Sequence, residues 1–79
     1  MNASEIKWIT EHNKAYQERP SRLIGIRHPR NPQIVYYPSA TTEVKIGEEW
    51  QEVILYGPIK ERACWGRTAD NFQKFTRAN

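Results

Sequence analysis

The sequence is poor in the residues that crosslink small proteins, with one cysteine, Cys64, and two histidines, His12 and His28, among 79 residues. One cysteine cannot form an internal disulfide, and these three side chains lack the spacing of a zinc site. We therefore expect no metal or other cofactor, and a fold stabilised by its hydrophobic core alone. A chain this short has room for one core, so residues 1–79 are predicted to form a single domain.

Long apolar runs are absent as well. No stretch approaches the roughly 18 consecutive apolar residues of a membrane-spanning helix, and residues 1–5 lack the basic and apolar regions of a signal peptide. We therefore expect a cytoplasmic protein that does not contact a membrane. Hydrophobic residues make up 38% of the chain and charged residues 27%, a balance that favours a globular domain over a disordered chain.

The formal net charge is +3, and the charges are segregated along the chain. Residues 19–37 contain four arginines and no acidic residue, whereas residues 43–52 carry a net charge of −3. Segregated charge can steer an anionic partner to one face of a protein, although the polar hairpin ends of any soluble domain also produce it. The acidic segment of one copy also complements the basic segment of another, so we expect a monomer or a weak homodimer.

The densest apolar run, Trp50–Tyr56, is rich in β-branched and aromatic residues and ends at a Gly-Pro pair. It is predicted to be the central strand of the fold. Residues 43–46 alternate between polar and apolar side chains and are predicted to form a hairpin with that strand. The predicted register pairs Val44 and Ile46 with Val53 and Leu55.

The other elements are predicted from capping residues, prolines and side-chain periodicity. A helix is predicted over residues 3–18, because Asn2 can cap its first turn and Pro20 stops it. Its predicted buried face contains Ile6, Ile9, Asn13 and Tyr16. Further strands are predicted over residues 22–28, 33–37 and 63–65, and a short helix over residues 69–75. The predicted fold is therefore α+β, with an N-terminal helix, an antiparallel four- to five-stranded bent sheet (a meander or a small barrel-like sheet) and a short C-terminal helix.

Two side chains are candidates for catalysis. Cys64 lies in a short apolar segment and is predicted to be a core residue rather than a nucleophile. His28, with Arg27, Arg30 and either Tyr36 or Tyr37, would supply the base, cations and phenol of a metal-free ribonuclease. In composition this set resembles that of small ribosome-associated toxins of bacterial toxin–antitoxin systems. No ordered motif accompanies it, so we assign no catalytic residue and expect no enzymatic activity.

Four arginines, Arg19, Arg22, Arg27 and Arg30, form what we call the basic band, and two tyrosines follow them on the next predicted strand. Arginines beside exposed aromatic rings can hold a phosphate while the ring stacks on a base. Arginines that alternate with apolar residues are also typical of an ordinary solvent-exposed sheet face. The predicted binding residues are Arg19, Arg22, Arg27, His28, Arg30, Tyr36, Tyr37 and Arg67.

The C-terminal third contains Trp65-Gly66-Arg67 followed by Phe72 and Phe75. This segment resembles the pattern Trp-x-Arg-Pro-x-x-x-Phe of a group of small bacterial and phage domains of unknown function, with Thr68 in place of the proline. The resemblance implies a bent sheet and no particular activity. Tryptophan and phenylalanine at these spacings also commonly close a hydrophobic core.

Three functions are compatible with these features. The first is a small non-catalytic binding protein, a phage-type accessory protein or inhibitor that contacts a host protein or nucleoprotein complex, because Arg, Trp and Tyr dominate interface energies. The second is direct binding of DNA or RNA through the basic band with Tyr36 and Tyr37. The third is a metal-free ribonuclease-type toxin that uses His28. We expect the first of the three.

Overall fold

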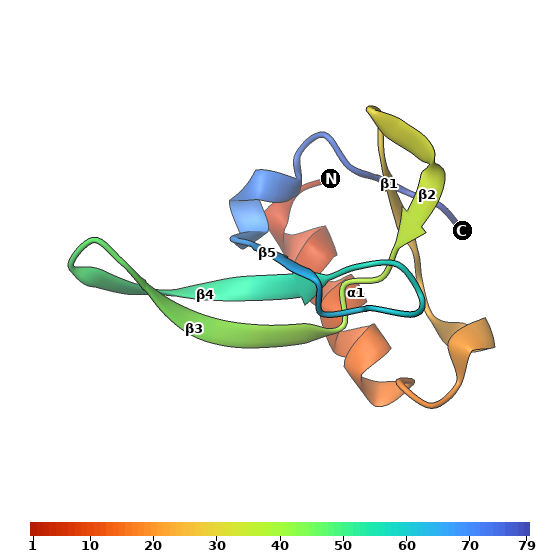
Figure 1. Cartoon of the computed structure of the whole chain (residues 1–79), viewed down its shortest axis with the longest axis horizontal. Coiled ribbons are helices and arrows are strands. Elements are labelled where there is room, and N and C mark those ends of the chain that lie inside the picture. Colours follow the sequence, from red (N-terminus) through yellow and green to blue (C-terminus); the bar gives the residue numbers. More distant parts are fainter.

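One helix and two three-stranded antiparallel sheets form the structure in the computed structural model, which covers residues 1–79 (Figure 1). The elements are α1 (Ala3–Ala15), η1 (Pro20–Arg22), β1 (Ile26–His28), β2 (Asn31–Tyr36), β3 (Ala40–Ile46), β4 (Glu49–Tyr56), β5 (Trp65–Arg67), η2 (Ala69–Phe72) and β6 (Thr76–Arg77). The first sheet has the strand order β2-β1-β6 and the second has the order β3-β4-β5. The α+β class and the N-terminal helix predicted from the sequence are confirmed.

The prediction of one bent or barrel-like sheet is wrong, because the strands form two separate sheets and neither closes on itself. The chain passes from the first sheet to the second at Pro38, which has no N–H group to continue a strand ladder. The residues on either side of it, Tyr37 and Ser39, donate their backbone N–H groups to the carbonyls of Gly57 and Leu55 (2.8 and 3.1 Å). As a result, β2 and β3 belong to different sheets although they are consecutive in the chain.

Helix α1 begins where the sequence predicts, because the Asn2 side chain accepts a hydrogen bond from the Glu5 backbone N–H (2.8 Å). The helix ends at Ala15, so the predicted helix over residues 3–18 is too long at its C-terminal end. Arg19, which precedes Pro20, has φ −127° and ψ 78°, and the residue before a proline is disfavoured in the helical region.

Strand β1 is shorter at its N-terminal end than the sequence predicts. Proline presets the backbone for a turn, and Pro20–Arg22 form the 3₁₀ turn η1. The backbone N–H of Ile24 then bonds to the Asn13 side chain (2.8 Å) instead of to a neighbouring strand. The close backbone approach expected at Gly25 is confirmed, because a Cβ there would overlap a methyl group of Val35.

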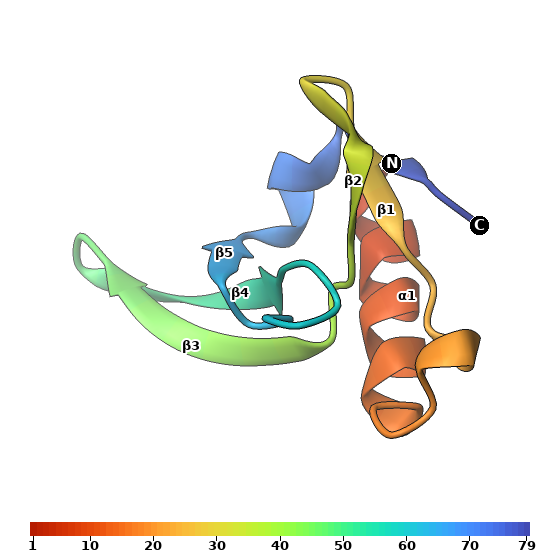
Figure 2. The same cartoon turned by 45° about the vertical axis from the view of Figure 1, so that its right-hand side comes forward.

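The β3–β4 hairpin projects from the body of the molecule in both views (Figures 1 and 2). Its tight turn contains Gly47 with φ +64°, a conformation that favours glycine. This turn pairs Ile46 with Glu49 and Val44 with Gln51. The predicted register, in which Val44 and Ile46 pair with Val53 and Leu55, is therefore wrong. It would require a longer turn between the two strands.

The hydrophobic core lies where α1 meets both sheets and the C-terminal segment, and it consists of Ile6, Ile9, Ile24, Ile26, Tyr36, Ile54, Tyr56, Phe72 and Phe75. The predicted helix over residues 69–75 is wrong, because the segment forms only the 3₁₀ turn η2, in which Asn71 leaves helical geometry (φ −94°, ψ 16°). After η2 the Phe75 N–H bonds to the Phe72 carbonyl (3.0 Å) in a further turn, and the rings of Phe72 and Phe75 lie 5.1 Å apart in the core.

Candidate functional site

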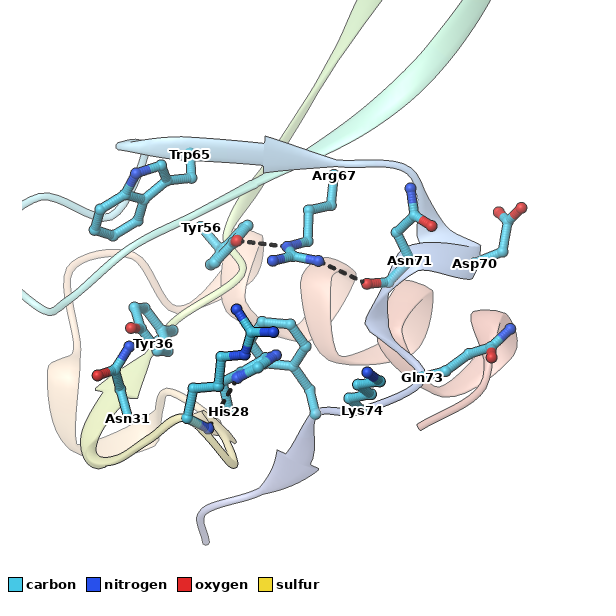
Figure 3. A pocket seen from close by; sticks show the side chains of 12 residues that line it. His28, Asn31, Tyr36, Tyr56, Trp65, Arg67, Asp70, Asn71, Gln73 and Lys74 are labelled. Atoms are coloured by element: carbon cyan, nitrogen blue, oxygen red, sulfur yellow. Dashed lines mark hydrogen bonds between the residues drawn. The ribbon is translucent and has the colours of Figure 1, made fainter.

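A cleft of about 670 Å³ opens between the β1–β2 hairpin, strand β5 and the segment that follows it (Figure 3). The 12 residues that line it are His28, Arg30, Asn31, Tyr36, Tyr56, Trp65, Arg67, Asp70, Asn71, Gln73, Lys74 and Phe75. Both sheets contribute to the cleft, so it exists only when they are packed together. Three of the lining side chains are cationic and one is acidic, so the lining carries a net positive charge, which favours anions.

Arg67 is held within the cleft by three neighbours (Figure 3). Its Nε–H donates to the Tyr56 hydroxyl (2.7 Å) and its Nη1 donates to the Asn71 carbonyl (3.2 Å). The guanidinium also lies over the Phe75 ring, 5.2 Å from the centroid. A guanidinium has five N–H donors, so these two hydrogen bonds leave three for a ligand.

His28 lies among the three cations of the cleft. Partial burial and, after it, the positive charges of Arg67, Arg30 and Lys74 hold the pKa of the imidazole below its usual value of 6.5. Its Nδ1 accepts the backbone N–H of Arg30 (3.1 Å), and its ring meets Phe75 edge to face at 4.9 Å. Neutral His28 therefore carries its proton on Nε2, from which it can donate a hydrogen bond.

The lowered pKa of His28 predicts a pH dependence of stability. Below pH 6.5 the unfolded chain binds a proton at this histidine more readily than the folded protein does. We therefore expect the free energy of unfolding to fall as the pH drops below 6.5, until the pH passes the lowered pKa. Urea denaturation measured between neutral and mildly acidic pH should show this fall in the wild type and a smaller one in H28Q. A fall that disappears in H12Q but persists in H28Q would contradict the assignment.

Aromatic rings form one wall of the cleft. Tyr36, Tyr56 and Phe75 are buried and pack edge to face, with ring centroids 5.7 to 6.2 Å apart. Trp65 meets Tyr36 at 5.9 Å, yet 49% of its surface stays exposed. An indole supported by buried rings presents a rigid, flat apolar face to a ligand.

The rim of the cleft adds exposed amide side chains from Asn31, Asn71 and Gln73. Amides offer both hydrogen-bond donors and acceptors, as the edges of nucleobases do. Arg30 and Lys74 are exposed at the same rim and supply positive charge without a counter-ion, since the ion pair found in the structure joins Lys14 to Glu11. The cleft thus combines side chains of the kinds that can bind an anion, stack on a planar ring and form hydrogen bonds with the polar edges of such a ring.

The structure brings together half of the predicted binding residues. His28, Arg30, Tyr36 and Arg67 line the cleft. The other four lie outside it. Arg19 is in the turn after α1, Arg22 is exposed in η1, Arg27 donates to the Pro32 carbonyl (2.6 Å), and Tyr37 lies beside Gly25. Of the four arginines of the basic band, Arg30 lines the cleft and Arg19, Arg22 and Arg27 do not.

Sequence reasoning did not assign three important cleft residues. The sequence leaves open whether Trp65 closes the core or is exposed, and Tyr56 and Lys74 are not among the predicted binding residues. One signal was present, because Trp65 and Arg67 are two apart in a strand and so face the same side of it. The signal for Lys74 was absent, since its position depends on the irregular path of the chain after η2.

The prediction that Cys64 belongs to the core is wrong, because its side chain is exposed in the loop before β5. Local desolvation, a hydrogen bond to the Glu61 carboxylate (3.7 Å) and the negative charge of that carboxylate raise the pKa of the thiol. A raised pKa disfavours the reactive thiolate.

Comparisons of this chain with protein-family models, with curated proteins and with solved structures found no match. No group of three or more His, Cys, Asp or Glu side chains is placed to hold a metal ion. None of the helices has both the length and the apolar character that crossing a bilayer requires.

Proposed function

We propose that this protein binds single-stranded nucleic acid in the cleft. In this proposal Arg30, Arg67 and Lys74 hold the phosphates, and Trp65 stacks on a base. The observation that carries it is the convergence of three cations around His28 in a cleft whose rim carries a half-exposed indole. Cations that track a backbone and aromatic rings that stack on bases are the two parts of single-strand binding sites.

The cations support phosphate binding because each lies close enough to His28 for its charge to help lower the pKa of the imidazole. An anionic phosphate placed among them would offset this concentration of positive charge. Arg67 is the best oriented of the three, since Tyr56 and Asn71 fix its guanidinium and leave donors unused. Phosphate would also favour protonated His28, which adds a fourth positive charge at acid pH.

The indole supports a single strand over a duplex. A base can stack on Trp65 only when it is unpaired and unstacked from its neighbours, as in single strands and loops. The cleft volume of about 670 Å³ falls in the range of roughly 300 to 1,000 Å³ that is typical of small-ligand pockets. A site of this size accepts a nucleotide that has turned away from its strand.

The test is fluorescence anisotropy with labelled single-stranded and duplex oligonucleotides at several salt concentrations. We expect the single strand to bind more tightly, with log affinity falling by about 0.7 per phosphate neutralised for each unit of log salt. R30A/K74A should flatten that slope by about 1.4, because two phosphate contacts are lost. W65A should weaken binding about 5- to 150-fold and leave the slope unchanged.

The matched controls remove the same groups outside the cleft. R19A/K60A deletes two exposed cations, and W50A deletes an indole that is 67% exposed on the hairpin. Both controls should bind as the wild type does. Absence of binding at low salt, or an equal loss in R19A/K60A and R30A/K74A, would overturn the proposal.

The same samples distinguish the other functions expected from the sequence. We propose binding without catalysis, so the RNA should remain intact during the measurement. Cleavage that disappears in H28A would favour the ribonuclease instead. If nucleic acid does not bind, the contact of a phage-type inhibitor with a host protein is the remaining proposal. Truncation of one exposed Trp should then weaken the complex more than removal of the cleft cations.

A further inference from the structure

Strand β3 has the longest free edge in the structure. The second sheet has the order β3-β4-β5, so the seven residues of β3 pair with another strand on one side only. β3 also runs along β4 without a shift in register. The other edge strands are less suited to pairing, because β5 has three residues, β6 has two and β2 contains Pro32.

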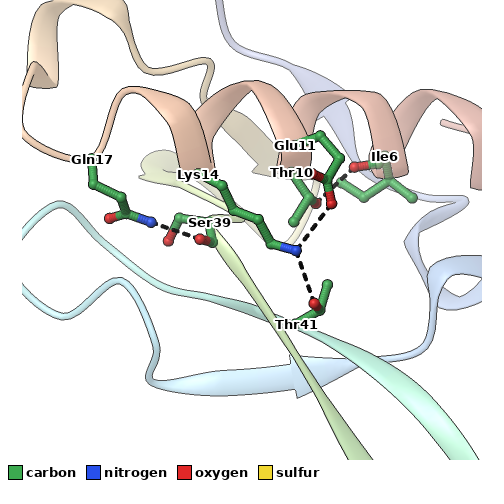
Figure 4. A network of polar contacts seen from close by, with 7 residues as sticks. All are labelled: Ile6, Thr10, Glu11, Lys14, Gln17, Ser39 and Thr41. Atoms are coloured by element: carbon green, nitrogen blue, oxygen red, sulfur yellow. Dashed lines mark hydrogen bonds and ion pairs between the residues drawn. The ribbon is translucent and has the colours of Figure 1, made fainter.

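The rest of the protein covers only the beginning of this edge. Lys14 on α1 donates to the Thr41 hydroxyl (2.9 Å), and Gln17 after α1 donates to the Ser39 carbonyl (2.6 Å) (Figure 4). Beyond these contacts the hairpin projects away from the helix (Figures 1 and 2). Backbone hydrogen bonds formed outside the helices and sheets include no residue of β3. The edge of residues 42–46 is therefore free to pair with another strand.

The charges on this edge are unmatched within the chain. Glu43 lies directly opposite Glu52 in the hairpin, and like charges in this arrangement are destabilising. Lys45 lies opposite Trp50 rather than an acidic residue. The ion pair found in the structure involves neither of them. A strand added at this edge would neutralise both unmatched charges if it placed a cation beside Glu43 and a carboxylate beside Lys45.

We propose that the added strand is β3 of a second copy of this chain. Two copies pair antiparallel about a two-fold axis at Val44, so that each Glu43 faces Lys45 of the other copy. Thr42 then faces Ile46 of the other copy, and both Val44 side chains meet at the axis. Residues opposite one another in such a pair lie on the same face of the sheet and a few ångströms apart, as side-chain contacts require.

The charge pattern selects this register over its neighbours. Moving the axis to residue 43 would place Glu43 opposite Glu43, and moving it to residue 45 would place Lys45 opposite Lys45. Pairing at Val44 gives two complementary contacts and a continuous sheet of order β5-β4-β3-β3-β4-β5. No lining residue of the cleft is on β3, so this association is independent of nucleic-acid binding.

The first test is the mass of the protein measured by sedimentation equilibrium over a range of concentrations. We expect the mass to rise from 9.3 kDa toward twice that value, with a dissociation constant on the order of 0.1 mM because the interface is small. E43K or K45E alone should weaken association about tenfold or more, since each places like charges opposite one another twice. The double variant E43K/K45E should restore it.

The matched control is K60E, which makes the same charge change as K45E at an exposed position in the loop before β5. It should associate as the wild type does. A protein that stays monomeric up to about ten times the expected dissociation constant overturns the proposal. So does a double variant that associates no better than the two single variants.

A cysteine crosslink tests the register. In a C64S background, V44C should form a disulfide-linked dimer on mild oxidation, because position 44 of one copy faces position 44 of the other at the axis. T42C is the control, since the two copies of that residue lie about 13 Å apart, beyond the roughly 7 Å Cα separation that a disulfide spans. Equal crosslinking of T42C and V44C overturns the proposed pairing.

Discussion

Asn13→Ala is expected to lower the free energy of unfolding by about 3 to 5 kcal/mol, the largest effect of any polar substitution in this protein. Asn13 is fully buried on α1 and joins the helix to the segment before β1 and to the link between β2 and β3. Its Nδ2 donates to the carbonyls of Ile24 and Pro38 (2.9 and 2.7 Å), and its Oδ1 accepts the Ile24 N–H (2.8 Å). Alanine would leave these backbone groups buried without partners, and each unsatisfied group costs about 1 to 3 kcal/mol.

Urea denaturation followed by circular dichroism measures this effect. Small domains are stable by only about 5 to 15 kcal/mol, so N13A should be largely unfolded at modest urea concentrations. Thr10→Val is the matched control, because Thr10 is buried on the same helix and its hydroxyl bonds only to the Ile6 carbonyl (2.7 Å). We expect T10V to lose less than about 1 kcal/mol. Equal losses in N13A and T10V would show that Asn13 has no special role.

Phe75→Ala is expected to lower the free energy of unfolding by about 3 to 5 kcal/mol and to disrupt the cleft. The ring is buried and contacts Phe72, Tyr36 and Tyr56, with centroids 5.1, 6.2 and 5.7 Å away. It also meets the edge of His28, and the Arg67 guanidinium lies over it. The same side chain therefore fills the core and positions two residues of the candidate site.

Phe75→Leu separates the two roles. Leucine keeps an apolar side chain in the core, so the loss of stability should be smaller, whereas the aromatic contacts with His28 and Arg67 disappear. We expect F75L to remain folded in the absence of urea and to bind single-stranded nucleic acid more weakly than the wild type. Denaturation curves and anisotropy on the same preparations check this. Wild-type affinity in F75L would show that the Phe75 ring does not position the cleft residues. Ile59→Ala is the control for stability, because Ile59 is 41% exposed.

Local features of the chain were predictable from the sequence. The Asn2 cap starts α1, proline stops the helix, and the alternation before Gly47 makes a strand of the projecting hairpin. Each of these depends on residues close together in the chain and on general backbone preferences. Asn13 is an exception. Its place in an apolar helical stripe could be predicted from the sequence, but its hydrogen-bond partners could not. Those partners come from Ile24 and Pro38, on segments far along the chain.

The sequence by itself determined the α+β class, the approximate elements and the uneven charge. Only the tertiary structure decided that the strands form two sheets, that the C-terminal segment is a 3₁₀ turn, and that Arg67 lies beside His28 while Arg19 lies elsewhere. The physical reason is that helix caps, turns and alternation act over a few residues, whereas the cleft requires contacts between segments dozens of residues apart. Which charges gather there depends on how the core packs, and no local pattern in the chain contains that information.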